Sequence, residues 1–266
     1  MTDPSQGARP FRVAPPRPVE PHPARQPRRG VAILPSLFTL GNLFCGYACI
    51  IYAMRGEFET AAPFIGLAVI LDILDGRIAR LTGTASEFGV QFDSMADVVS
   101  FGLAPAVLTF AWGLSTLGRL GWATAFLFVT TAALRLARFN IQTPSADKRF
   151  FVGLPSPAAA GVLASTVFAY PAGLLQFRSS LPAILLVVVP ALMMVSTVKF
   201  RSFKTFDLQA RRPFRVLILF AVLLLAIVTH PQSVLVVMSY GYLISPLIGM
   251  LISRLRRKPD PPAASS

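Results

Sequence analysis

The sequence predicts an all-α, polytopic membrane protein. Of its 266 residues, 54% are hydrophobic and only 14% are charged, a balance that fits an integral membrane protein and not a water-soluble domain. Apolar segments long enough to cross the roughly 30 Å hydrocarbon core recur along the chain. Basic residues gather in alternate connections between these segments, as expected for a chain that crosses the membrane repeatedly.

About eight transmembrane helices are expected, one for each long apolar segment. The second and third segments are less apolar than the others because they carry a group of acidic residues. Small residues lie beside those acids and would allow close helix packing. In chain order the segments are residues 35–54, 60–81, 90–113, 120–137, 155–175, 181–198, 214–229 and 233–253.

The connections sort by charge into two sets. In one set the only basic residues are Arg55, Arg119 and Arg178. The other, basic set comprises residues 9–29, 77–80, 135–149, 199–215 and 254–258. Because cytoplasmic connections are enriched in Lys and Arg, we expect both termini in the cytoplasm. The expected location is a bacterial inner (cytoplasmic) membrane, with the acidic group toward its cytoplasmic half.

The two ends of the chain differ in composition from the apolar middle. Residues 1–33 are rich in Pro and Arg and lack the pattern of a cleaved signal peptide. They are predicted to form a disordered basic cytoplasmic arm, acting either on anionic lipid or simply as a topology determinant. Residues 34–176 are expected to form the catalytic transmembrane core, 177–257 additional helices with a basic cytoplasmic loop, and 258–266 a disordered tail.

Charge and cysteine usage exclude several functions. The net charge of +13 does not indicate a nucleic-acid protein, because the basic residues alternate with apolar runs. The two cysteines, Cys45 and Cys49, lie within one apolar segment. A disulfide framework is therefore excluded, and a structural zinc site lacks ligands.

Four of the twelve acidic residues fall in one stretch at membrane depth. A carboxylate there costs roughly 2.5–3.5 kcal/mol even on a lenient insertion scale, so four together require a cation or a reaction. Spacings of three and four residues place each pair on one helix face. The pattern is Asp72-x2-Asp75-Gly76-x2-Ala79-Arg80-x8-Gly89-x3-Asp93-x3-Asp97.

This pattern suits phosphoryl-type transfer. Two packed helices would aim four carboxylates into one cavity, which is more than one Mg²⁺ ion needs and enough for two ions or for an ion pair and a base. Arg80 lies where it can meet a phosphate, and a spare carboxylate can take a proton from an alcohol. A cation transporter also uses buried acids. The spacing favours the enzyme, because eight fixed positions rarely match by chance.

The stretch from Asp72 to Asp97 resembles the signature of the CDP-alcohol phosphatidyltransferases. The resemblance implies that the first six helices form a catalytic bundle, that two Mg²⁺ or Mn²⁺ ions are bound, and that CDP-diacylglycerol is the donor. It implies metal ligation by Asp72, Asp75 and Asp93, with Asp97 in the same carboxylate set and acting as general base. It further implies nucleotide or diphosphate contacts from Gly76, Arg80 and Ser86, and, through the segment from Pro35 to Asn42, from Thr39 and Asn42. A homodimer is expected on the same basis.

Two later segments concern the acceptor alcohol. Arg135-Leu-Ala-Arg138-Phe-Asn140 and the segment from Phe151 to Gly161 resemble the branch of the family that transfers to L-serine. An arginine can pair with a carboxylate through two parallel bonds, so Arg135 and Arg138 are candidate serine contacts. Topology anchoring or lipid-phosphate contact is an equally good interpretation of both, and glycerol 3-phosphate or an inositol phosphate is the alternative acceptor.

Overall fold

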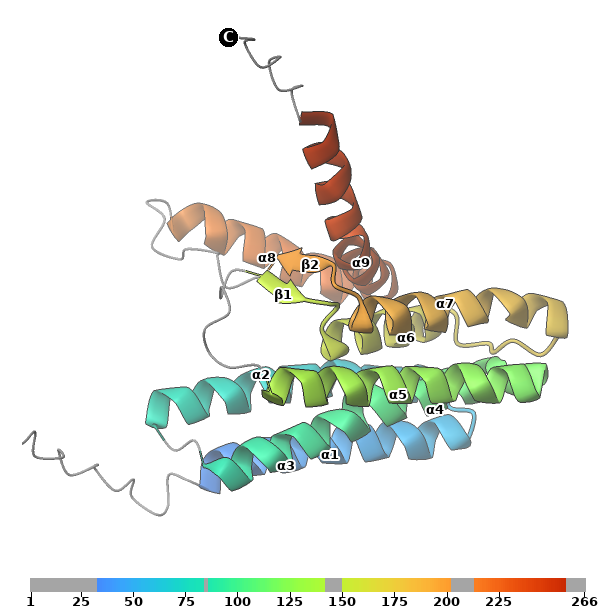
Figure 1. Ribbon diagram of the computed structural model, residues 1–266, viewed down its shortest axis with the longest axis horizontal. Coiled ribbons are helices and arrows are strands. Elements are labelled where there is room, and N and C mark those ends of the chain that lie inside the picture. Colours follow the sequence, from blue (N-terminus) through green and yellow to red (C-terminus); the bar gives the residue numbers. More distant parts are fainter. Residues whose placement is uncertain (1–32, 84–85, 142–149, 202–212, 257–266) are drawn as a thin grey trace, which may run out of the picture.

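The computed structural model describes residues 33–83, 86–141, 150–201 and 213–256 (Figure 1). Within them the chain forms eight helical rods and one pair of short strands. The third rod is a continuous run of α3 (Glu87–Asp97), a π-helical turn η1 (Val98–Leu103) and α4 (Ala104–Trp112). The other rods are α1 (Ile33–Met54), α2 (Phe58–Thr82), α5 (Arg119–Ile141), α6 (Ser156–Ala169), α7 (Phe177–Val195), α8 (Pro213–Thr229) and α9 (Pro231–Arg256).

Each of the eight predicted apolar segments coincides with one of these rods, so the all-helical prediction is confirmed. By length and composition, three rods can cross a membrane: residues 35–54, Glu87–Trp112 and Arg119–Ile141. Two shorter apolar helices, Ser156–Ala169 and Ser180–Val195, accompany them. The chain is therefore a polytopic membrane protein. α2 has 25 residues, but its acidic and basic side chains interrupt the apolar run.

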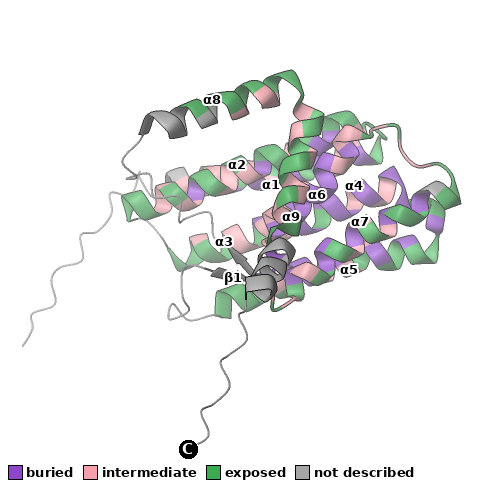
Figure 2. Ribbon diagram, turned by 90° about the horizontal axis from the view of Figure 1, so that it is seen from above, coloured by how far each residue is buried: buried purple, intermediate pink, exposed green. Residues whose placement is uncertain are grey.

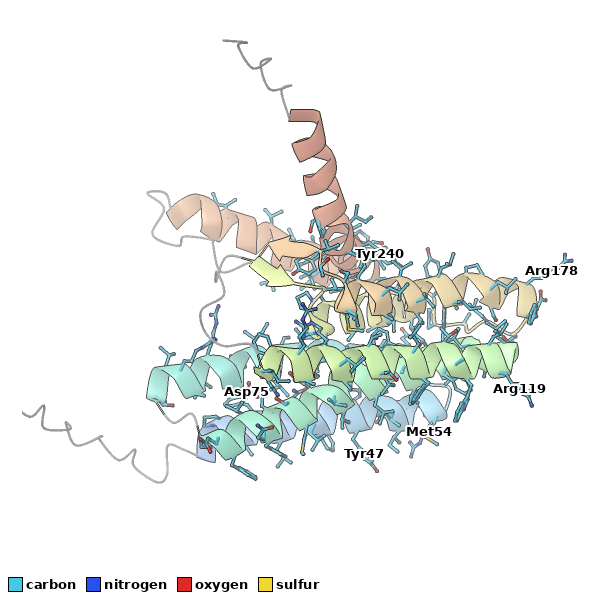
Figure 3. All side chains as sticks on the ribbon, in the orientation of Figure 1. Tyr47, Met54, Asp75, Arg119, Arg178 and Tyr240 are labelled. Carbon is cyan, nitrogen blue, oxygen red and sulfur yellow. The ribbon has the colours of Figure 1, made fainter. Side chains whose placement is uncertain are left out.

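The core lies where the middle of the chain packs together. Figure 2 shows buried residues concentrated in α4, α5, α6 and α7, whereas α8 is exposed over most of its described length. The largest fully buried side chains include Phe101, Phe128, Leu108 and Leu163. In Figure 3, Asp75 lies toward one end of the bundle, and Arg119 and Arg178 lie at the other.

α6 is shorter than the predicted span of residues 155–175. It ends at Ala169, because Pro171 has no N–H to continue the helix and restricts the residue before it. The chain then turns through Gly173, whose φ of 72° suits glycine. The indole N–H of Trp112 donates to the carbonyl oxygen of Tyr170 over 2.7 Å, so this turn is tied to the end of α4.

Two short strands were not anticipated from the apolar pattern. β1 (Phe150–Val152) pairs antiparallel with β2 (Lys199–Arg201). The chain beyond β1 continues the contact, since the Gly153 N–H donates to Val198 O and the Leu154 N–H to Met193 O, both over 2.9 Å. This clip joins the segment before α6 to the segment after α7.

Several predicted features lie outside the residues that the structure describes. These are the basic arm before residue 33, the tail after residue 256, and residues 202–212 of the basic connection before α8. The proposed disorder of the arm and the tail stays a prediction.

Candidate active site

Three of the four motif aspartates form one cluster. Asp72 and Asp75 lie on α2, and Asp93 lies on α3. One carboxylate oxygen from each lies within 4.8 Å of the other two. Mg²⁺ binds oxygen at about 2.0–2.1 Å, so two oxygens on one ion are at most about 4.2 Å apart. A small movement of these side chains would bring the three oxygens onto one ion. Asp93 Oδ1 is buried without a hydrogen-bond partner among the described residues. The donor set and this unsatisfied oxygen fit a hard divalent cation.

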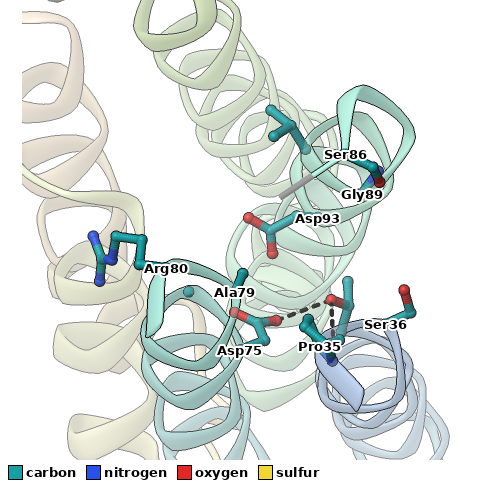
Figure 4. Close-up of a pocket in the computed structure, with 11 residues that line it drawn as sticks. Pro35, Ser36, Asp75, Ala79, Arg80, Ser86, Gly89 and Asp93 are labelled. Carbon is teal, nitrogen blue, oxygen red and sulfur yellow. Dashed lines mark hydrogen bonds between the residues drawn. The ribbon is translucent and has the colours of Figure 1, made fainter. Parts of the chain in front are cut away.

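Thr39 of α1 fixes one member of the cluster. Its hydroxyl lies 3.0 Å from Asp75 Oδ2 and 3.2 Å from the Pro35 carbonyl oxygen, and Figure 4 shows both contacts. Thr39 and Asp75 are each only 4% exposed. A buried carboxylate that accepts such a bond is held in one orientation. α1 therefore orients a carboxylate that α2 supplies.

Asn42, one turn further along α1, holds the fourth aspartate. Its Nδ2 donates to Asp97 Oδ1 over 3.2 Å, and Asn42 is fully buried. The Ser100 hydroxyl donates to the Asn42 carbonyl oxygen over 2.9 Å. Asp97 is the last residue of α3, directly before the π-helical turn, and it lies within electrostatic range of Asp72 and Asp93. The structure thus brings all four aspartates together.

A cavity of about 250 Å³ opens beside the cluster (Figure 4). Four residues predicted to contact the nucleotide line it, namely Thr39, Gly76, Arg80 and Ser86. Asn42, the fifth of these predicted contacts, does not line the cavity. The other lining residues are Pro35, Ser36, Asp75, Ala79, Gly89, Val90 and Asp93. Of these, Val90 carries no polar group and could not be singled out from the sequence.

Arg80 and Ser86 occupy the cavity rim in different ways. In Figure 4 the Arg80 side chain points away from Asp75 and Asp93, and the residue is exposed. Ser86 caps α3, since its Oγ accepts from the Gly89 N–H over 3.0 Å. The amino end of α3 therefore meets the cavity, and helix amino ends favour anions.

The two arginines of α5 are placed differently. Arg135 Nη1 donates to the hydroxyl of the fully buried Ser156 over 3.1 Å, and Arg135 lies within electrostatic range of Asp97. Its Nε is buried and has no partner among the described residues. Arg138 is exposed. The structure therefore brings Arg135 to the aspartates and leaves Arg138 at the surface.

Ser156 was not assigned a role from the sequence. It stands directly after Pro155 in the segment quoted for the acceptor, so a helix start was the only signal it offered. Asn140, in the other quoted segment, donates from Nδ2 to the Ser94 hydroxyl over 3.0 Å and joins α5 to the helix that carries Asp93 and Asp97.

Comparison with known proteins agrees with this geometry. The model of the CDP-alcohol phosphatidyltransferase family matches residues 32–200. A CDP-diacylglycerol–serine O-phosphatidyltransferase of Helicobacter pylori strain J99 is 37% identical over 217 residues, which cover 81% of this chain and 90% of that protein. The Bacillus subtilis protein of the same name is 33% identical over 64% of this chain and 91% of its own length. An archaetidylserine synthase of Methanothermobacter thermautotrophicus is 34% identical over 63% of this chain and 69% of its own. The chain belongs to the CDP-alcohol phosphatidyltransferase family.

Proposed function

We propose that this protein transfers the phosphatidyl group of CDP-diacylglycerol to the hydroxyl of L-serine, giving phosphatidylserine and CMP. The observation that carries the proposal is the aspartate cluster at the cavity, because its carboxylates suit the diphosphate chemistry of this family. The choice of serine is supported by the relatives from Helicobacter and Bacillus, which are serine O-phosphatidyltransferases.

Asp72, Asp75 and Asp93 would hold the divalent cations, Mg²⁺ or Mn²⁺. Asp97 would be the fourth carboxylate of this group. Bound there, two ions would offset the charge of the diphosphate and of the departing CMP. Thr39 keeps Asp75 turned toward the cluster through the 3.0 Å bond. The cavity beside these carboxylates receives the cytidine diphosphate part, with Gly76 leaving space and Ser86 placing the amino end of α3 at its edge.

Asp97 is the proposed general base. The bond from Asn42 engages Oδ1, which leaves Oδ2 to accept the proton of the serine hydroxyl. The serine oxygen forms a bond to the lipid-linked phosphorus, and the bond from that phosphorus to the oxygen of CMP breaks. The electron pair of the broken bond leaves with CMP, and the proton remains on Asp97 until it is released to solvent.

Arg135 is the proposed contact for the serine carboxylate. A buried donor without a partner is costly, and the Arg135 Nε is such a donor close to the base. A carboxylate arriving with the substrate would accept from it and remove that cost. Arg138, which is exposed, is the weaker candidate for this role.

The placement in the membrane belongs to the same proposal. The first six rods form the catalytic bundle, both termini face the cytoplasm, and the acyl chains of the donor extend sideways into lipid. The separation of Asp75 from Arg119 and Arg178 supports this orientation (Figure 3). We also propose a homodimer, on the resemblance alone.

An acceptor panel tests the function. The purified protein receives CDP-diacylglycerol and Mg²⁺ or Mn²⁺ with L-serine, glycerol 3-phosphate or inositol phosphate, and CMP release and the lipid product are measured. We expect CMP and phosphatidylserine with L-serine and little of either with the phosphorylated alcohols. Preference for a phosphorylated alcohol would overturn the choice of serine. Absence of CMP with every acceptor, together with cation flux in vesicles, would indicate a transporter.

A further inference from the structure

α9 lies beyond residues 32–200, the part of the chain that the family model describes, yet it packs against a helix of the catalytic bundle. Ser239 and Ser165 share a hydrogen bond of 2.7 Å, and the Tyr240 hydroxyl lies 3.0 Å from the Thr166 hydroxyl. Leu243 of α9 is also buried. The hydrogen-bonded polar pairs hold α9 in one position on α6.

The helix that α9 contacts also carries the support for Arg135. Ser156, the first residue of α6, receives the 3.1 Å bond from Arg135 Nη1. α6 therefore links the guanidinium at its amino end with α9 along its length. A residue of α9 that lies near the amino end of α6 is therefore also near Arg135, the proposed contact for the serine acceptor.

Tyr242 is that residue. Its half-buried side chain lies close enough to the Arg135 guanidinium for the two to interact electrostatically. Pro246 lacks the N–H that would bond to the Tyr242 carbonyl oxygen, and the Ser245 hydroxyl donates to that oxygen instead over 2.8 Å. Tyr242 thus stands in the last turn before the proline, and beyond it α9 extends away from the bundle (Figure 1).

We propose that α9 completes the acceptor side of the site and that Tyr242 is a positioning residue for Arg135. A guanidinium only donates hydrogen bonds, and a phenol oxygen accepts them. Ser156 holds one nitrogen of Arg135 from α6 and Tyr242 restrains the group from α9, which directs the free Nε toward Asp97 and the serine carboxylate. The inference rests on the proposed transfer to serine.

Two tyrosines of α9, Tyr242 and Tyr240, provide the test. Tyr242→Phe removes the hydroxyl that we propose restrains Arg135 and keeps the ring. Tyr240→Phe, the matched control, removes the hydroxyl that faces Thr166 at the same helix interface (Figure 3 shows Tyr240). Both are made in the full chain, and KM for L-serine, KM for CDP-diacylglycerol, kcat and the midpoint of thermal unfolding are measured.

We expect Tyr242→Phe to raise the KM for L-serine about two- to tenfold, the effect of losing the proposed hydrogen bond to Arg135, with the KM for CDP-diacylglycerol unchanged. Tyr240→Phe should leave both constants near those of the parent. In the Arg135→Lys background, Tyr242→Phe should add little, because residues that act through one group are not additive.

Other results would overturn the inference. An unchanged KM for L-serine in Tyr242→Phe would do so, as would an equal rise in both tyrosine variants or an undiminished effect in the Arg135→Lys background. A parent protein that forms no phosphatidylserine would instead refute the proposed function, so the two failures are distinguishable.

Discussion

Gly46 on α1 lies at a close contact between α1 and the helical rod that carries Asp97. A Cβ added there would lie 2.6 Å from the Ser100 hydroxyl oxygen and 2.8 Å from the Ser100 Cα. Carbon atoms normally rest at about 3.5 Å or more, so Gly46→Ala must move the backbone of η1 outward by about 0.7 Å. Overpacking of this kind costs roughly 1–3 kcal/mol. A shift of about 1 Å in a catalytic group lowers turnover by a factor on the order of 100.

The expected result is a lower midpoint of thermal unfolding in detergent and a kcat reduced by one to two orders of magnitude. Metal binding should be affected less, because η1 carries none of the three clustered aspartates. Gly66→Ala is the matched control, since an added Cβ there meets nothing within 4 Å and alanine favours a helix by roughly 0.5–1 kcal/mol. CMP release and a melting curve measure both variants. If Gly46→Ala and Gly66→Ala both have the kcat and the melting midpoint of the parent, the close contact at Gly46 does not position Asp97.

Three further substitutions, the last with a matched control, test the site. Asp97→Asn keeps the shape and removes the base, so CMP release should fall by a factor on the order of 10²–10⁴ while CDP-diacylglycerol binding persists; near-normal turnover would exclude Asp97 as the base. Asp75→Ala should abolish activity and weaken Mn²⁺ binding measured by titration, and parent-like metal binding would show that Asp75 is not a ligand. Arg135→Lys should raise the KM for L-serine about tenfold, since lysine cannot form the planar fork. The exposed Arg138→Lys should change it less, and the reverse order would reassign the serine contact.

The apolar pattern of the sequence was sufficient to locate every rod, because a membrane span needs a long apolar run and little else. It was insufficient where the backbone departs from a regular helix. The π-helical turn at Val98–Leu103 leaves no mark in composition, since its residues are as apolar as their neighbours. The β1–β2 clip joins residues about fifty positions apart through backbone groups, and side-chain patterns do not report such pairing.

The active-site contacts likewise include some that the sequence could predict and some that it could not. Helical spacing was enough to place Asp72 with Asp75, and the recognised motif brought Asp93 and Asp97 to them. The bond from Thr39 to Asp75 spans 36 positions and depends on how α1 packs on α2. Spacing alone also treated Arg135 and Arg138 as equivalent, because residues three apart share a helix face. The bond from Arg135 to Ser156 of α6 and the proximity of Arg135 to Asp97 distinguish it from the exposed Arg138.

The π-helical turn has a consequence for how this protein can vary. Each residue of an α-helix rotates the chain by about 100° about the helix axis. A π turn holds one residue more than a regular turn. The carboxylates of α3 and the buried face of α4 are therefore out of phase by about that angle. Deleting one residue from Val98–Leu103 would restore an ordinary helix and rotate Leu108 and Trp112 away from the core, with every aspartate unchanged. The length of this segment is thus under as much constraint as its composition, and insertions or deletions there should be tolerated less well than substitutions.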